Sequence, residues 1–239
     1  MIIQVVGTGS ISSISNSPSY IIDNKILIDM PNGNYKNIKR LGIDPVTINH
    51  ILITHFHGDH YFDMPFYLLK LVDSEKKEVF IYVNRSGIRK IKKLVKLAFL
   101  YSYYRIMINI KVIGIKKRKF NIFDYEVEKV NVDHGYLKNA YGYIIKHNNI
   151  KVGFTGDANY TERIDYLANN CDYLFCDTTF INGTDIHMGI DNLSLLASKY
   201  PKCIFVATHM SDNTRKKIKK LKFKNVIVPK DGDVIKIHD

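Results

Sequence analysis

Three histidines and one aspartate lie within six consecutive positions of this 239-residue chain, from His55 to His60. Residues 54–60 read Thr-His-Phe-His-Gly-Asp-His and follow directly on the apolar run Ile48 to Ile53. Imidazole and carboxylate groups bind first-row divalent cations, and a loop held at the end of a buried strand fixes their directions. The alternative is a surface turn that gathers three of the nine histidines by chance. The segment therefore predicts a metal site at the end of a strand.

Apolar runs and amphipathic segments alternate along the chain, which is the pattern of an α/β fold. Strands are expected at 2–6, 20–22, 25–28, 48–54, 79–83, 110–113, 125–132, 141–146, 151–155, 173–176, 203–207 and 226–228. Helices are expected at 34–41, 61–71, 86–101, 160–168, 192–199 and 213–221. The hydrophobic share of 46% suits a packed core, and no repeat or Gly/Pro-rich linker divides the sequence. We expect a single domain over residues 1–239.

The sequence does not predict membrane insertion or secretion. No apolar run approaches the roughly 20 residues that span a bilayer, and the first residues lack the basic segment and cleavage site of a signal peptide. The cysteines Cys171, Cys176 and Cys203 contain no Cys-x-x-Cys spacing, so neither a disulfide framework nor a cysteine zinc site is expected. We expect a cytoplasmic protein without a membrane partner.

The net charge of +12 is concentrated in one stretch of the chain. Residues Arg85 to Lys119 contain twelve Lys and Arg and no Asp or Glu, and the rest of the chain has 35 − 12 = 23 bases against 23 acids. Such a stretch attracts polyanions, most often phosphate backbones, although a solvated helix face is the alternative. The sequence therefore offers Arg85 to Lys119 as a candidate surface for RNA.

Three further residues stand just beyond the end of an apolar run, as the histidine-rich loop does. His134 follows the expected strand 125–132, Asp157 follows 151–155, and His209 follows 203–207. Each alone would be weak evidence, because a single histidine is more often structural. Together they supply the remaining ligands of a metal site.

The His-x-His-x-Asp-His loop with these later ligands resembles the pattern of the metallo-β-lactamase fold superfamily over nearly the whole chain. The resemblance implies an α/β fold of four layers, an αββα sandwich, and two divalent cations per chain. In that pattern His55, His57 and His134 hold one cation, Asp59, His60 and His209 hold the other, and Asp157 bridges the two. Zn²⁺ is the expected metal, with Mn²⁺ and Fe²⁺ as alternatives that such ligands accept.

Two positions narrow the chemistry that this resemblance implies. His57 stands where the flavodiiron oxidoreductases of the superfamily carry a carboxylate, which disfavours a redox role. Asp157 stands where the lactam-hydrolysing members carry a cysteine, which disfavours antibiotic hydrolysis. The set suits a dinuclear hydrolase.

Shorter segments are similar to the ribonuclease Z group, the tRNA 3′-processing endonucleases. They are Gly7-Thr8-Gly9-Ser10, Cys176-Asp177-Thr178-Thr179-Phe180 and His187-Met188-Gly189. Asp177 matches that group's acidic position and His187 its loop histidine, whereas Met188 and Gly189 depart from the usual neighbours. The Gly/Pro-rich arm with which that group grips tRNA has no counterpart in this sequence, which puts tRNA cleavage itself in doubt.

The sequence thus predicts a metal-dependent phosphodiesterase that acts on RNA 3′ ends or small phosphodiesters through a metal-bridging hydroxide. Asp59 would position the nucleophile and accept its proton, and His187, with Asp177 behind it, would protonate the leaving oxygen. The alternatives are a lactone or thioester hydrolase of the same fold and a nucleic-acid-binding protein with a vestigial metal site. The resemblance also makes a homodimer a candidate assembly.

Two predictions concern residues outside this set. Asp29 follows an expected strand and could orient one ligand imidazole. His50 is expected on the exposed side of its strand.

Overall fold

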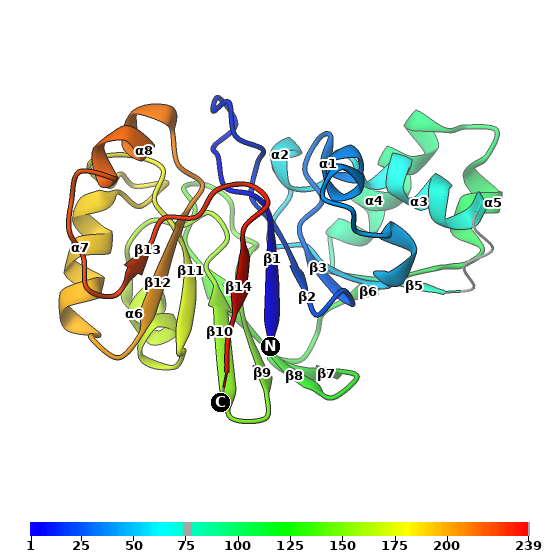
Figure 1. Ribbon diagram of the computed structural model, residues 1–239. Coiled ribbons are helices and arrows are strands. Elements are labelled where there is room, and N and C mark those ends of the chain that lie inside the picture. Colours follow the sequence, from blue (N-terminus) through cyan, green and yellow to red (C-terminus); the bar gives the residue numbers. More distant parts are fainter. Residues whose placement is uncertain (74–77, 239) are drawn as a thin grey trace.

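The computed structural model describes residues 1–73 and 78–238. Two seven-stranded sheets pack face to face, and helices cover the outer face of each sheet (Figure 1). In spatial order the first sheet consists of β14 (Val234–Lys236), β1 (Ile2–Gly7), β2 (Ser19–Ile22), β3 (Ile26–Ile28), β4 (His50–Leu52), β5 (Val79–Val83) and β6 (Ile110–Gly114). The second consists of β13 (Val226–Ile227), β12 (Ile204–Thr208), β11 (Tyr173–Asp177), β10 (Ile150–Phe154), β9 (Ala140–His147), β8 (Tyr125–Val132) and β7 (Lys119–Ile122).

Helices divide between the two outer faces. On the side of the first sheet lie α1 (Asn34–Arg40), α2 (Gly58–Tyr61), α3 (Met64–Asp73), α4 (Gly87–Ala98) and α5 (Tyr103–Met107). On the side of the second lie α6 (Glu162–Asn169), α7 (Ile190–Lys199) and α8 (Asp212–Ile218). The fold is therefore the expected αββα sandwich. Among the described residues, no helix is long and apolar enough to cross a membrane.

Three apolar clusters fill the spaces between these layers. The central cluster joins the two sheets, where the ring of Tyr20 lies 5.2 Å from that of Phe154 and 4.8 Å from that of Phe175. The other two clusters lie beneath the two helical layers. Truncating one of these buried aromatic side chains to alanine would lower the free energy of unfolding by about 3–5 kcal/mol. This packing holds the two sheets in a fixed relation, and with them the residues at their edge.

The functional residues stand at one edge because of strand direction. β3, β4, β5 and β6 are parallel to one another, as are β10, β11 and β12. β8 runs in the direction of β10 because both are antiparallel to β9. The segments that follow β8, β10 and β12 therefore leave the second sheet at the same edge, where ligand sites of open α/β sheets also lie. The segment that follows β4 reaches this edge too, because the carbonyl of Thr54 accepts a hydrogen bond from the N–H of Tyr141 at the start of β9.

The structure differs from the sequence-based expectations in a few elements. β7 and β14 were not expected; β7 is polar and pairs as a hairpin with β8, and β14 is only three residues long. The expected helix 61–71 corresponds to α3, which begins at Met64 and ends at Asp73, and the unexpected short helix α2 precedes it and ends at Tyr61. The short α5 follows α4, whose residues end at Ala98 and not at 101.

The expectation for His50 was wrong. Its side chain is buried, its ring stacks on Phe80 with centroids 4.9 Å apart, and its Nδ1 lies 3.0 Å from the hydroxyl of Tyr82. The alternation of polar and apolar residues along β4 does not reveal that the neighbouring strand β5 contributes Phe80 and Tyr82, which cover the imidazole of His50.

Candidate metal centre

The histidine-rich segment is held at the end of β4 by one buried carboxylate. Asp29 accepts hydrogen bonds from the backbone N–H of Thr54 at 2.8 Å and from its hydroxyl at 2.6 Å. His55 and His57 lie in extended chain, and α2 begins at Gly58, so Asp59 and His60 project from its first turn. The change from strand to helix, over the five residues between Leu52 and Gly58, aims these side chains at a common region.

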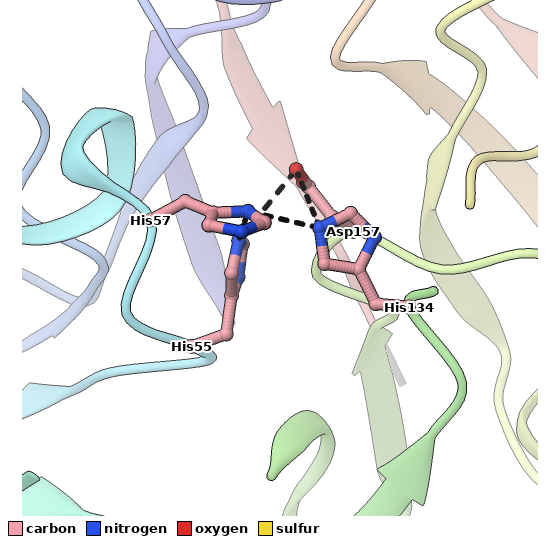
Figure 2. Close-up of side chains that lie close together, drawn as sticks. All are labelled: His55, His57, His134 and Asp157. Atoms are coloured by element: carbon pink, nitrogen blue, oxygen red, sulfur yellow. Dashed lines mark hydrogen bonds and ion pairs between the residues drawn. The ribbon is translucent and has the colours of Figure 1, made fainter. Parts of the chain in front are cut away.

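Three imidazoles and one carboxylate converge in what we term the first cluster, His55, His57, His134 and Asp157 (Figure 2). The Nδ1 of His57 lies 3.1 Å from the Nε2 of His55 and 3.0 Å from the Nε2 of His134. The carboxylate of Asp157 is 3.7 Å from His55 and 4.0 Å from His134. Nitrogens around a tetrahedral Zn²⁺ with bonds of about 2.0–2.1 Å would be roughly 3.3 Å apart, so the spacing fits a cation.

The second cluster consists of Asp59, His60, Asp157 and His209, and it shares Asp157 with the first. Asp157 lies 3.2 Å from the Nε2 of His60 and 3.3 Å from the Nε2 of His209. Both Nε2 atoms are buried, and neither has a hydrogen-bond partner among the described residues. Buried polar atoms of this kind require a partner, and their position opposite two carboxylates fits a divalent cation.

The electrostatics favour positive charge between these ligands. Burial lowers the pKa of His55 well below its ordinary value and so keeps the imidazole neutral, the form that binds metals. Burial also disfavours protonated His60, but Asp157 and Asp29 raise its pKa well above the ordinary range. Burial would raise the pKa of Asp157, yet His209, His60 and His55 hold it well below its usual value. Asp157 therefore stays ionised at the point where the two clusters meet.

A further set of hydrogen bonds orients the ligand imidazoles. The Nδ1 of His60 lies 2.8 Å from Asp29, as predicted for that aspartate, and the Nδ1 of His209 lies 2.6 Å from the hydroxyl of Thr179. The Nδ1 of His134 bonds to the carbonyl oxygen of Ile186 at 2.9 Å. With Nδ1 occupied in this way, each ring presents Nε2 to the site.

The backbone is strained at two of these positions. Asp29 has φ +57° and His209 has φ +54°, and a left-handed conformation costs a non-glycine residue on the order of 1–3 kcal/mol. Glycine meets the same need before Asp157: Gly156 has φ +61°, and a Cβ there would lie 2.9 Å from the Cβ of Thr54. The strain is retained where it aims a side chain at the site.

His187 and Asp177 stand together beside both clusters. The Nδ1 of His187 lies 2.8 Å from an oxygen of Asp177, and its ring is stacked on that of His209 with centroids 5.1 Å apart. Burial would lower the pKa of His187, but Asp177 raises it above the ordinary value. Asp177 also accepts hydrogen bonds from the backbone N–H groups of Ala158 and Thr179. The pair thus fixes an imidazole with a raised pKa at the rim of the site.

The structure brings together every residue that the sequence placed in the site, and it adds three that the sequence did not. Thr54 holds Asp29, Thr179 links Asp177 to His209, and the carbonyl of Ile186 orients His134. The two threonines lie next to or near predicted site residues in the sequence, and this position could have identified them. A backbone carbonyl, which every residue has, cannot be identified from the sequence.

The sandwich has the metallo-β-lactamase fold. A metallo-β-lactamase fold protein, YhfI from Bacillus subtilis, superposes with a TM-score of 0.79 and 17% identity over 98% of each chain. The short form of human tRNase Z superposes with a TM-score of 0.77 and 17% identity over the full length of both chains.

Among proteins with this fold, the chain belongs to the family described as anti-Pycsar protein Apyc1, whose model matches residues 1–231. It is also similar to a ribonuclease Z of Thermococcus sibiricus, with 23% identity over 277 aligned residues that cover 90% of this chain and 87% of the relative. The resemblance to the ribonuclease Z-like branch is therefore confirmed.

Proposed function

We propose that this protein is a metal-dependent phosphodiesterase with two divalent cations per chain. The observation that carries the proposal is the His187–Asp177 pair at 2.8 Å, presented beside the two ligand clusters. Breaking a P–O bond to an alkoxide requires a proton at the leaving oxygen, and an imidazole backed by a carboxylate can supply it. A hydrolase of activated acyl groups has less need of such a donor.

The donor set fits two cations that share Asp157. His55, His57 and His134 would hold one, and Asp59, His60 and His209 would hold the other. Such a pair supplies a water of lowered pKa and positive charge that stabilises the phosphate oxygens in the transition state. Zn²⁺ is the proposed metal, since His/Asp sites of this kind bind it readily.

Two side chains of the protein would accept and donate protons in the reaction, Asp59 and His187. Burial would raise the pKa of Asp59, but His209 and His60 hold it below its ordinary value, so the carboxylate is ionised and can accept a proton. Asp59 orients the attacking water, and the Nε2 of His187, whose other nitrogen faces Asp177, donates to the leaving oxygen. Thr179 fixes Asp177 relative to His209, because its hydroxyl lies 2.7 Å from Asp177 and 2.6 Å from His209.

RNA 3′ ends are the proposed substrate, with small phosphodiesters as the narrower alternative. The names of the ribonuclease Z and tRNase Z relatives support RNA. The α4 helix supports it too, because Arg89, Lys93 and Lys96 are all exposed on its surface. Elsewhere in the basic stretch, however, Arg105 pairs with Asp73 and Arg118 with Glu128, so part of that charge is already neutralised. A homodimer remains a prediction.

The test is hydrolysis of bis(p-nitrophenyl) phosphate, a lactone and a thioester by one sample whose metal content is also measured. We expect the phosphodiester to be cleaved fastest, by protein that holds about two first-row divalent ions per chain and loses activity with them on chelation. Preference for the lactone or thioester would replace the proposal by the acyl-hydrolase alternative. Full affinity for RNA without turnover of any ester would instead favour a binding protein.

A further inference from the structure

A cavity of about 240 Å³ is lined by residues from the two chain segments that carry His55, His57 and His134 and from the beginning of α4. One wall is Phe56, which stands between His55 and His57 in the sequence. The second is the beginning of α4 with Lys90, and the third is the turn after His134, with Tyr136 and Lys138. The volume lies below the roughly 300–1,000 Å³ of clefts that enclose a drug-sized ligand, so the cavity has room for one ring system and not for a whole ligand.

The walls of this cavity are tied to one another. Asn84 accepts hydrogen bonds from the N–H of Gly87 at 2.8 Å and from the hydroxyl of Ser86 at 2.7 Å, and it donates to the carbonyl of Asn139 at 3.1 Å. The buried side chain of Asn84 thereby joins the start of α4 to the turn after His134.

Phe56 is fixed against the helix. A Cβ at position 87 would lie 2.3 Å from its ring, so only glycine allows α4 to begin this close to it. The ammonium of Lys90 lies 4.9 Å from the ring centroid on the helix side. The cavity is therefore a preformed feature and not a gap between independent loops.

Its chemistry combines an unpacked aromatic ring with positive charge. Tyr136 is 104% exposed, so its ring makes no packing contact within the protein although it stands two residues from a metal ligand. Lys90 and Lys138 contribute two ammonium groups, and none of the described residues that line the cavity is acidic. Aromatic faces bind nucleobases by stacking, and ammonium groups bind phosphate through charge-assisted hydrogen bonds.

We propose that this cavity binds one nucleotide residue of the substrate, with the base against Tyr136 and a phosphate other than the cleaved one at Lys90 and Lys138. The inference rests on the proposed function, since it assigns the site that positions a phosphodiester at the first cluster. Stacking tolerates all bases, so the site selects for a nucleotide and not for a particular sequence. Asn84 acts as a positioning residue that keeps the two lysine-bearing walls together.

Binding can be measured without turnover, because the chain contains no tryptophan. Tyr136→Trp would place a single indole at the site, and Tyr101→Trp is the matched control, since Tyr101 is 101% exposed on the basic stretch. The probe is thymidine 3′,5′-bisphosphate, a phosphomonoester that a phosphodiesterase does not cleave. We expect saturable quenching of the indole fluorescence in the Tyr136→Trp variant and none in the Tyr101→Trp variant. Binding should be about tenfold weaker when Lys90→Gln and Lys138→Gln are added to Tyr136→Trp, and thymidine or inorganic phosphate alone should bind more weakly than the bisphosphate.

A kinetic pair separates this site from the catalytic groups. Thymidine 5′-(p-nitrophenyl phosphate) and methyl p-nitrophenyl phosphate share a leaving group and differ in the nucleoside. Tyr136→Ala should raise KM for the nucleoside ester by about fivefold or more and leave the methyl ester within twofold, whereas Tyr136→Phe should behave as wild type. Equal or absent quenching at positions 136 and 101 would overturn the site even in an active enzyme, and inactivity towards both esters would overturn the proposed function without affecting the quenching result.

Discussion

The two ligand clusters share Asp157 but differ in how they are enclosed. All four members of the second cluster are buried, and both of its imidazoles are oriented by side chains, His60 by Asp29 and His209 by Thr179. In the first cluster His57 is exposed, and His134 is oriented by a backbone carbonyl. The cavity described above is lined by Phe56, which stands between His55 and His57 in the chain, and by Lys90 of the basic helix α4. Under the proposed function, the second cluster would therefore be the one that retains its cation, and the first would be the one that admits the substrate.

The largest expected effect comes from the residue that both clusters share. Asp157→Asn keeps the shape of the side chain and removes the negative charge that holds two cations together. We expect hydrolysis of bis(p-nitrophenyl) phosphate to fall by about 10³-fold or more and both ions to bind more weakly, measured by elemental analysis of the purified protein.

Asp59→Asn is the matched control, because Asp59 contributes to the second cluster alone. It should weaken one ion and leave the other in place, while Asp59→Ala should also cost several orders of magnitude in turnover with the fold intact. If Asp157→Asn and Asp59→Asn remove the same single ion, the clusters do not share Asp157.

The next effect tests the proton donor, which stands at the rim of both clusters. His187→Ala should slow diesters with alkoxide leaving groups by about 10²–10⁴-fold but nitrophenyl esters far less, because nitrophenolate leaves without a proton. His147→Ala is a control of the same type, since His147 pairs with Asp124 at 2.7 Å at the far end of β9. Equal slowing of both kinds of ester would assign His187 to substrate binding.

The sequence predicted which residues gather in the two clusters far better than it predicted the groups that orient them, and the reason is physical. A ligand is visible because its side-chain type is restricted and its position follows a strand, as for His134 and His209. The group that orients a ligand imidazole can be any hydrogen-bonding group that the fold brings near. Asp29 was predicted from its place after a strand, whereas the backbone carbonyl of Ile186 could belong to a residue of any type. His50 was misplaced for a related reason, because its partners Phe80 and Tyr82 come from another strand.

The difference in supports leads to a smaller and more selective effect. Asp29→Asn should lower the affinity of the second cluster's cation by about 10–100-fold, since the partner that orients His60 loses its charge. The first cluster's cation should be retained, and excess metal should restore turnover, as measured by competition with a chelator and by activity at increasing metal concentration. Equal loss of both ions would show that the clusters do not differ in the way proposed.

The last prediction concerns the surface that RNA would contact. Changing its charge should alter the affinity for RNA clearly and the rate of hydrolysis of a small ester least of all. Arg89, Lys93 and Lys96 are exposed on α4, whose first residue packs against Phe56. Reversing all three to Glu should weaken binding of a tRNA precursor by roughly tenfold or more and flatten its salt dependence. Turnover of bis(p-nitrophenyl) phosphate should stay within about threefold, because no ligand changes.

The same change of charge on the other side of the molecule provides the control. Reversing the exposed Lys216, Lys217 and Lys219 at α8 to Glu alters the net charge equally but lies beneath neither the first cluster nor its cavity. If the substrate approaches the open cluster, the α8 variant should retain most of the affinity that the α4 variant loses. Equal losses in both would mean that RNA responds only to the overall charge, and negligible RNA affinity in the unmodified protein would reduce the substrate to a small phosphodiester held by the nucleotide cavity alone.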